Sequence, residues 1–153
     1  TSGQERMIDD LTHVMTAPMD FGYEFHFDGH WAVMWMGSAI GAYDVDSGRF
    51  EEVTRCSAGD CHTYYGDGIV AFDRSGDDGL DQHQLFVYSL ESGAEEQLTF
   101  LRPYYDVAIP QSMLGRRLLW SEGRGKAIAD LCGNKREPTG RTALYFWKDI
   151  ELD

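Results

Sequence analysis

An acidic, glycine-containing stretch is the part of the sequence whose residue types point most directly to a ligand. Residues 73–83 read DRSGDDGLDQH. Carboxylate oxygens are the ligands that Ca²⁺ prefers, and glycines allow a loop to wrap around the ion. The spacing departs from the EF-hand pattern, because Asp78 stands where that pattern needs glycine and Gln84 replaces its final glutamate. The stretch therefore predicts either a site for Ca²⁺, which is the only candidate cofactor, or a solvated acidic turn. The candidate ligands are Asp73, Asp77, Asp78 and Asp81.

A later stretch carries the opposite charge. Five of the 13 basic residues lie within residues 124–141, in a chain whose formal net charge is -13. This positive island could bind an anionic partner, or it could pair with the acidic stretch, each exposed pair contributing about 0 to 1 kcal/mol. The residues are Arg124, Lys126, Lys135, Arg136 and Arg141.

Paired tyrosines form a third candidate site, because an aromatic ring can stack on a sugar or another flat ligand. The pairs are Tyr64 with Tyr65 and Tyr104 with Tyr105, and both are expected in connections between structural units. Packing within the fold is the alternative for these rings. The five histidines show no metal-ligand spacing, so each is expected to be structural.

The cysteines indicate the compartment. Cys56 and Cys61 bracket a short Ser-Ala-Gly-Asp connection, which predicts a small disulfide loop formed in an oxidising, extracellular or periplasmic environment. Cys132 is the third cysteine and has no fourth to pair with, so it is a free thiol or forms an intermolecular bond.

Composition excludes several classes of function. A net charge of -13 repels nucleic acid and anionic lipid. No apolar run approaches the roughly 18 residues that a membrane-spanning helix needs. The sequence also contains no Gly-x-Ser-x-Gly, His-Glu-x-x-His or phosphate-binding glycine-rich motif. We therefore expect no nucleic-acid partner and no membrane span, and the protein is more consistent with a binding module than with an enzyme.

An internal repeat predicts the architecture. Residues 43–54 (YDVDSGRFEEVT) match residues 88–99 (YSLESGAEEQLT) at a shift of 45 positions. Each copy reads as an aromatic-led strand, a turn and a polar strand. Gly48 and Gly93 are placed where a hairpin turn needs positive φ. A matching strand precedes each hairpin and recurs near residue 120, with Trp35, Phe72 and Trp120 aligned as its aromatic residue.

Short strands in units of 40 to 50 residues are typical of β-propeller blades. The expected fold is all-β, a propeller segment of about three four-stranded antiparallel blades that forms an incomplete ring. The blades are expected at residues 25–54, 55–99 and 100–153, the last with a long inserted loop. Residues 1–24 are expected to close a preceding blade or to form a short helix. An ordinary antiparallel sandwich is the alternative fold.

The pattern Gly-x-x-Val-x-Trp/Phe, then Leu-Tyr-x-Tyr-Asp-Leu-x-Ser-Gly-x-Glu-x-x-Leu-Thr, resembles blades of the TolB-like, WD40-like propeller repeats. Residues 66–99 match it best, and the resemblance covers most of the chain beyond residue 24. The resemblance implies a binding or scaffolding surface, because relatives serve as interaction modules, as gating domains beside peptidases and occasionally as lyases.

Three blades are too few to close a ring, so the first and last should each expose an apolar face and an unpaired strand edge. We therefore expect a non-enzymatic protein-interaction or scaffold module that self-associates or is completed by another chain. Two alternatives stay open: the propeller part of a secreted hydrolase or lyase, and a structural subunit of a cell-surface assembly.

Overall fold

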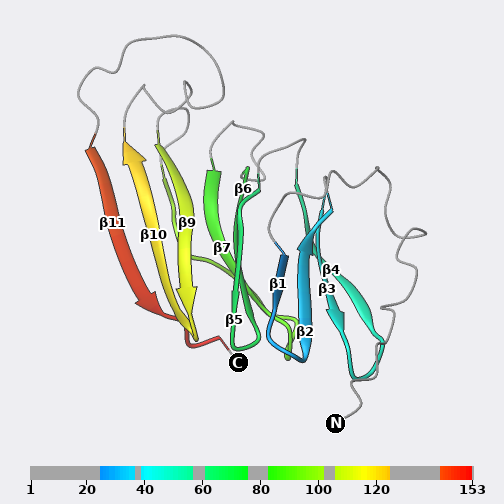
Figure 1. Cartoon of the computed structure of the whole chain (residues 1–153). Coiled ribbons are helices and arrows are strands. Elements are labelled where there is room, and N and C mark those ends of the chain that lie inside the picture. The colour runs from blue at the N-terminus through cyan, green and yellow to red at the C-terminus, as the bar shows by residue number, and fades with distance from the viewer. Residues whose placement is uncertain are drawn as a thin grey trace.

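Three antiparallel β-sheets, each formed by one continuous part of the chain, make up the fold (Figure 1). The computed structural model describes residues 25–36, 39–56, 61–75, 83–101, 106–124 and 142–152. These residues form strands, turns and connections and contain no helix, which confirms the all-β prediction. The N-terminal segment 1–24, expected to be a closing strand or a helix, lies outside them.

Each sheet is a meander, in which strands that follow one another in sequence are neighbours in space. Sheet 1 consists of β1 (Phe25–Phe27), β2 (Trp31–Trp35), β3 (Ala39–Asp44) and β4 (Phe50–Arg55). Sheet 2 consists of β5 (Thr63–Gly66), β6 (Ile69–Ser75), β7 (His83–Ser89) and β8 (Glu95–Gln97). Sheet 3 consists of β9 (Asp106–Leu114), β10 (Arg117–Arg124) and β11 (Thr142–Asp149). Sheet 3 thus has three strands among the described residues, where four were expected.

The two predicted hairpins are present and share one turn geometry. Gly48 and Gly93 both have φ of 73°, in the left-handed region that glycine adopts without steric cost. The Gly48 N–H donates to the Asp44 carbonyl at 2.8 Å, and the Gly93 N–H donates to the Ser89 carbonyl at 2.9 Å. The repeat seen in the sequence is therefore a repeat of backbone structure.

One backbone hydrogen bond recurs in all three sheets and fixes which residues are equivalent. In each sheet, the N–H just after the third strand donates to the carbonyl just before the second strand. The three bonds, each 2.9 Å, join Val45 to His30, Leu90 to Gly68 and Ile150 to Arg116.

This equivalence corrects the alignment of the aromatic residues. Counting from the recurrent bond, Met34 is the position equivalent to Phe72 and Trp120, and Trp35 lies on the opposite face of β2. The sequence misled here because β2 is apolar on both faces. A strand without polar–apolar alternation carries no mark of which residues face which way.

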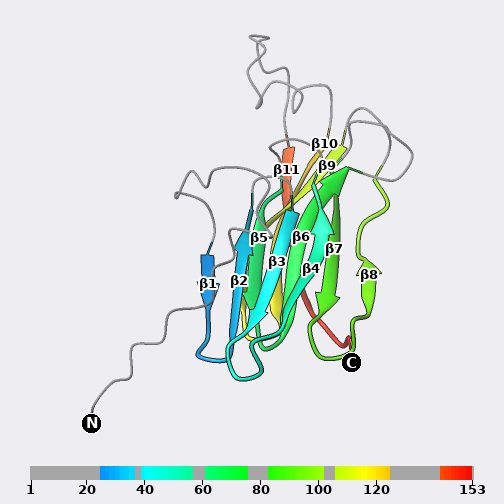
Figure 2. The same cartoon turned by 90° about the vertical axis from the view of Figure 1, so that its right-hand side faces the viewer.

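The sheets stack side by side (Figures 1 and 2). Apolar side chains are buried between them. Sheet 2 is covered on both faces. Val70 and Phe72 belong to the cluster shared with sheet 1, whereas Ala71 and Val87 belong to the cluster shared with sheet 3. All four side chains are fully buried. Among the described residues, these clusters join each sheet to the adjacent one, which is consistent with an incomplete ring of blades.

Sheets 2 and 3 are in close contact at two glycines. Gly66 ends β5, and Gly115 lies in the turn between β9 and β10 with φ of 56°. A Cβ atom at position 66 would overlap the Gly115 carbonyl oxygen.

Among the described residues, no helix has the length and hydrophobicity needed to cross a bilayer.

Candidate functional site

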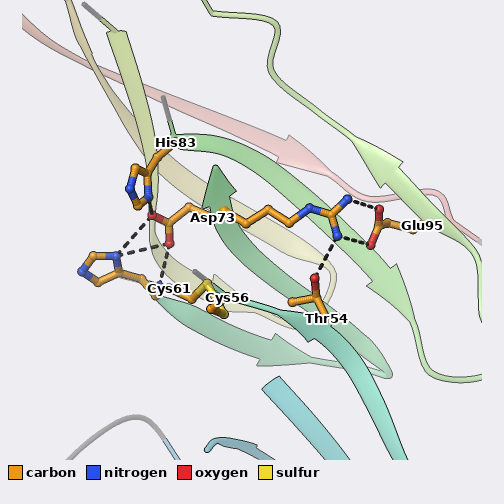
Figure 3. Close-up of a disulfide and its surroundings, with 8 residues drawn as sticks. Thr54, Cys56, Cys61, Asp73, His83 and Glu95 are labelled. Carbon is orange, nitrogen blue, oxygen red and sulfur yellow. Dashed lines mark hydrogen bonds and ion pairs between the residues drawn. A yellow bond between two sulfur atoms is a disulfide. The ribbon is translucent and has the colours of Figure 1, made fainter. Parts of the chain in front are cut away.

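Asp73, the first of the predicted Ca²⁺ ligands, is a buried residue of β6 and not part of an exposed loop (Figure 3). Its carboxylate accepts a hydrogen bond from the His62 backbone N–H at 2.6 Å. The imidazole Nδ1 atoms of His62 and His83 lie 3.2 and 2.7 Å from its two oxygens. Both oxygens therefore have protein partners.

The other three predicted ligands, Asp77, Asp78 and Asp81, lie outside the described residues, so the Ca²⁺ site stays a prediction. Burial by itself would raise the pKa of Asp73, but hydrogen bonds from His62 and His83 outweigh it and lower the pKa. The carboxylate is thus held in its ionised form. The two histidines, predicted to be structural, here orient a buried charge between β5 and β7.

We expect Asp73→Asn to lower the free energy of unfolding at pH 7 by about 2 kcal/mol, because charged hydrogen bonds at a buried site are lost. A carboxylate whose pKa is lowered by folding stabilises the protein above its unfolded pKa of about 4, and this is lost as pH falls through the folded pKa. The difference between wild type and variant is therefore expected to shrink between pH 5 and pH 3, measured by urea unfolding.

The exposed Asp67, in the turn before β6, provides a control position, because asparagine tolerates its positive φ of 46°. Asp67→Asn is expected to change stability by less than about 0.5 kcal/mol at either pH. An equal loss for Asp73→Asn at both pH values would contradict the role of its charge.

A disulfide joins Cys56, just after β4, to Cys61, just before β5 (Figure 3). The two Cα atoms are 6.0 Å apart, within the usual range for such a bond. Both residues are buried in the cluster between sheets 1 and 2. The bond therefore closes the connection between these two sheets.

We expect Cys56→Ala with Cys61→Ala to lower the free energy of unfolding by about 2 kcal/mol, since a short closed loop restricts the unfolded chain. Urea unfolding with and without dithiothreitol measures the effect. Wild type is expected to lose stability on reduction, whereas the double variant is expected to be unaffected. If dithiothreitol also lowered the stability of the double variant, the loss of stability on reduction would have to come from another cysteine.

Arg74 links the two sheets beside this disulfide. Its guanidinium donates to the Thr54 hydroxyl of sheet 1 at 2.8 Å and to the Glu95 carboxylate of β8 at 2.7 and 3.1 Å (Figure 3). The same guanidinium lies 4.1 Å from the centre of the Phe86 ring. Charge and packing thus hold sheets 1 and 2 in one position relative to each other.

One group of described residues has its potential metal ligands close together: His30, Asp44 and Asp46. His30 Nδ1 lies 2.7 Å from the Asp46 carboxylate. Asp44 accepts hydrogen bonds from the backbone N–H groups of Asp46 and Ser47 and from the Ser47 hydroxyl. These bonds are typical of an aspartate that stabilises a turn, so the group is explained by the β3–β4 hairpin.

The predicted tyrosine platform is divided by the strand that carries it. Tyr64 and Tyr65 are consecutive residues of β5, so their side chains point to opposite faces. The Tyr65 hydroxyl donates to Asp28 at 2.5 Å and accepts from the Gly68 N–H at 3.2 Å, and burial together with Asp28 raises its pKa. Tyr65 thus ties sheet 1 to sheet 2. The second pair, Tyr104 and Tyr105, lies outside the described residues.

The predicted basic island also lies mostly beyond the described structure. Arg124 is the last residue of β10. Lys126, Lys135, Arg136 and Arg141 fall in the segment between β10 and β11, outside the described residues, as does Cys132. Binding of an anionic partner there stays a prediction.

The outer face of sheet 3, which points away from sheet 2, carries several large apolar side chains that are exposed to solvent. Leu119, Tyr145 and Trp147 lie on it and are 37%, 67% and 64% exposed. Leu114, opposite Arg117 in the β9–β10 register, adds a fourth exposed apolar side chain. We call these four residues the open face.

The equivalent positions in the other two sheets are fully buried. Leu119 corresponds to Val33 and Ala71, Trp147 to Ala42 and Val87, and Tyr145 to Ile40 and Leu85. Each of those six side chains has no exposed surface, because the next sheet packs against it. The open face therefore has the position and the chemistry of a sheet-to-sheet interface.

One ion pair lies beside the open face. Arg117 donates to the Asp149 carboxylate at 2.8 and 3.0 Å, and its guanidinium stands 4.9 Å from the centre of the Trp147 ring. Their side-chain hydrogen bond raises the pKa of Arg117 and lowers the pKa of Asp149, so each residue favours the charged form of the other. Opposite charges thus balance next to the apolar side chains.

The outer face of sheet 1, at the other end of the stack, differs from the open face in how much of its apolar surface is buried. Ala32, Met34 and Tyr43 on that face are buried within the chain, and Phe25 and Phe27 of the edge strand β1 are exposed. Both end faces therefore carry exposed apolar side chains among the described residues, but those of sheet 1 are confined to its edge strand β1, whereas those of sheet 3 lie on all three of its strands.

Sheet 3 also has an open edge among the described residues. In sheets 1 and 2 the third strands, β3 and β7, pair with the fourth strands β4 and β8. No described strand pairs with the corresponding side of β11. A free edge and a free face thus meet at β11.

Comparison with known proteins adds no further constraint: no protein-family model, curated protein or solved structure matches this chain.

Proposed function

We propose that this chain is a non-enzymatic interaction or scaffold module, built from propeller blades of the TolB-like kind, whose open face packs against a sheet of another chain. The observation that carries the proposal is the contrast between equivalent positions. Side chains that are fully buried in sheets 1 and 2 are 37% to 67% exposed in sheet 3.

The energetics favour an occupied face. A buried aromatic side chain removes roughly 150–250 Å² from water, and apolar area contributes about 25 cal/mol per Å². Tyr145 and Trp147 are both aromatic and both largely exposed, beside Leu114 and Leu119. Contiguous exposed apolar patches of this kind mark interaction sites on protein surfaces.

The polar clusters support binding rather than catalysis. Asp73 is held by two histidines within sheet 2, and Arg74 pairs with Glu95 and reaches the Thr54 hydroxyl of sheet 1, so these groups already have structural partners. The buried disulfide favours folding in an oxidising compartment and supports the proposal of an extracellular or periplasmic location.

Site-specific photo-crosslinking in the native cell tests the proposal. Benzoylphenylalanine replaces Trp147 on the open face in one variant and the exposed Glu52 of β4 in the control. We expect a covalent adduct to a polypeptide from position 147 and none from position 52. Absence of any adduct from position 147, with the protein folded, would refute an interaction through this face.

A further inference from the structure

We propose that the occupant of the open face is a second copy of this chain, bound through the same face, so that sheet 3 packs against sheet 3 across a two-fold axis. This inference rests on the proposed function and names its partner. A symmetric interface of this type closes at two copies, because each copy covers the open face of the other.

The state of the two end faces selects this geometry. Head-to-tail stacking would place the open face of one copy on the outer face of sheet 1 in the next copy. That outer face has Ala32, Met34 and Tyr43 already buried within its own chain. Among the described residues, that face exposes only Phe25 and Phe27 on its edge strand, whereas another open face offers exposed apolar side chains on all three of its strands and is the broader partner for Tyr145 and Trp147.

Charge also favours a second copy at this surface. The whole chain carries a formal net charge of -13, so two copies repel each other in most relative orientations. Beside the open face, the cation Arg117 and the anion Asp149 balance each other. Across a two-fold axis, Arg117 of each copy can pair with Asp149 of the other, so the surface is electrostatically complementary to itself.

The register of sheet 3 supports face-to-face packing. Leu119 and Trp147 are direct cross-strand partners, and Ser121 and Tyr145 are the next pair on the same face. Ser112 of β9 lies opposite Leu119. The face is thus a continuous surface over three strands, on which the large side chains of Leu114, Leu119, Tyr145 and Trp147 lie beside the small Ser112 and Ser121, and two copies can interdigitate there.

Sedimentation of the purified protein over a concentration series tests the stoichiometry. We expect the mass to rise from 17.3 kDa to twice that value and no further. Tyr145→Ser with Trp147→Ser is expected to weaken the dimer at least about 30-fold, since central aromatic residues dominate interface energies. Both residues are exposed in the single chain, so the variant is expected to fold, checked by circular dichroism.

Phe25→Ser with Phe27→Ser is the matched variant at the other end of the stack. It removes two exposed aromatic side chains from sheet 1 and is expected to leave the dimer dissociation constant within about twofold of wild type. Loss of the dimer in this variant would overturn face-to-face packing and establish head-to-tail association. Species larger than a dimer would overturn it too.

Single cysteines test the symmetry. In a Cys132→Ser background, we expect Ser112→Cys or Ser121→Cys to form a disulfide between two copies on oxidation, and Glu52→Cys on β4 to form none. A monomer at every concentration would refute the second copy as partner. The proposed function would still stand in that case if the crosslinker at position 147 captured a different polypeptide, and would fail only if it captured none.

Discussion

Phe72→Ala is expected to lower the free energy of unfolding by about 4 kcal/mol, the typical cost of truncating a fully buried phenylalanine. Phe72 lies in the middle of the cluster between sheets 1 and 2, with its ring stacked on Phe86 at a centroid distance of 5.8 Å. The Arg74 guanidinium stands over the same pair. Truncation leaves a cavity that these rigid strands cannot fill, so lost contacts and lost burial add together.

The measurement is urea unfolding followed by tryptophan fluorescence. Phe100→Ala is the matched control, because Phe100 is 82% exposed and its truncation is expected to cost less than about 0.5 kcal/mol. Similar losses for the two variants would show that the interface between sheets 1 and 2 does not carry the stability. Since domains are stable by only about 5 to 15 kcal/mol, Phe72→Ala is expected to be partly unfolded at 37 °C.

Gly66→Ala is expected to cost about 3 kcal/mol, although it adds a single methyl group, because overpacking of this kind costs about 1 to 3 kcal/mol. The added Cβ would overlap the carbonyl oxygen of Gly115 in the facing sheet. A side chain could rotate away, but a backbone carbonyl moves only if the turn between β9 and β10 moves with it. Sheets 2 and 3 would therefore separate.

Gly68→Ala separates this clash from the ordinary cost of replacing glycine. Gly68 has positive φ of 76°, and no heavy atom lies within 4 Å of the position that an added methyl group would take. Its replacement is therefore expected to cost about 1 kcal/mol through backbone strain alone. Thermal unfolding of both variants gives the comparison. If Gly66→Ala is no more destabilising than Gly68→Ala, the close approach of sheets 2 and 3 does not limit the packing.

The sequence predicted the sheets well because their signals are local. Gly48 and Gly93 mark two hairpin turns, and both turns have the conformation that glycine permits. The face of each strand was harder to predict, as the misalignment of Trp35 shows. A strand buried on both sides has no polar side chain to mark an orientation, and only hydrogen bonds to its neighbours fix the register.

The candidate sites were harder still, because they depend on residues distant in sequence. Asp73 was grouped with the acidic residues that follow it, but its partners are His62 and His83, about ten positions away on either side. Nothing in a local pattern distinguishes a buried, paired aspartate from a loop aspartate. The open face was predictable only in outline, as an apolar end to the stack, since naming Leu119 and Trp147 requires the register of sheet 3.

The meander order of the strands has a consequence for folding. None of the described strands of one sheet inserts into another, so each sheet can form from a single short segment before it docks. Such linear assemblies gain stability from each neighbour, and the middle unit gains it twice. At concentrations where the chain is monomeric, amide hydrogen exchange is therefore expected to be slowest in β6 and β7 and to be faster toward both ends of the stack, with β11 opening first.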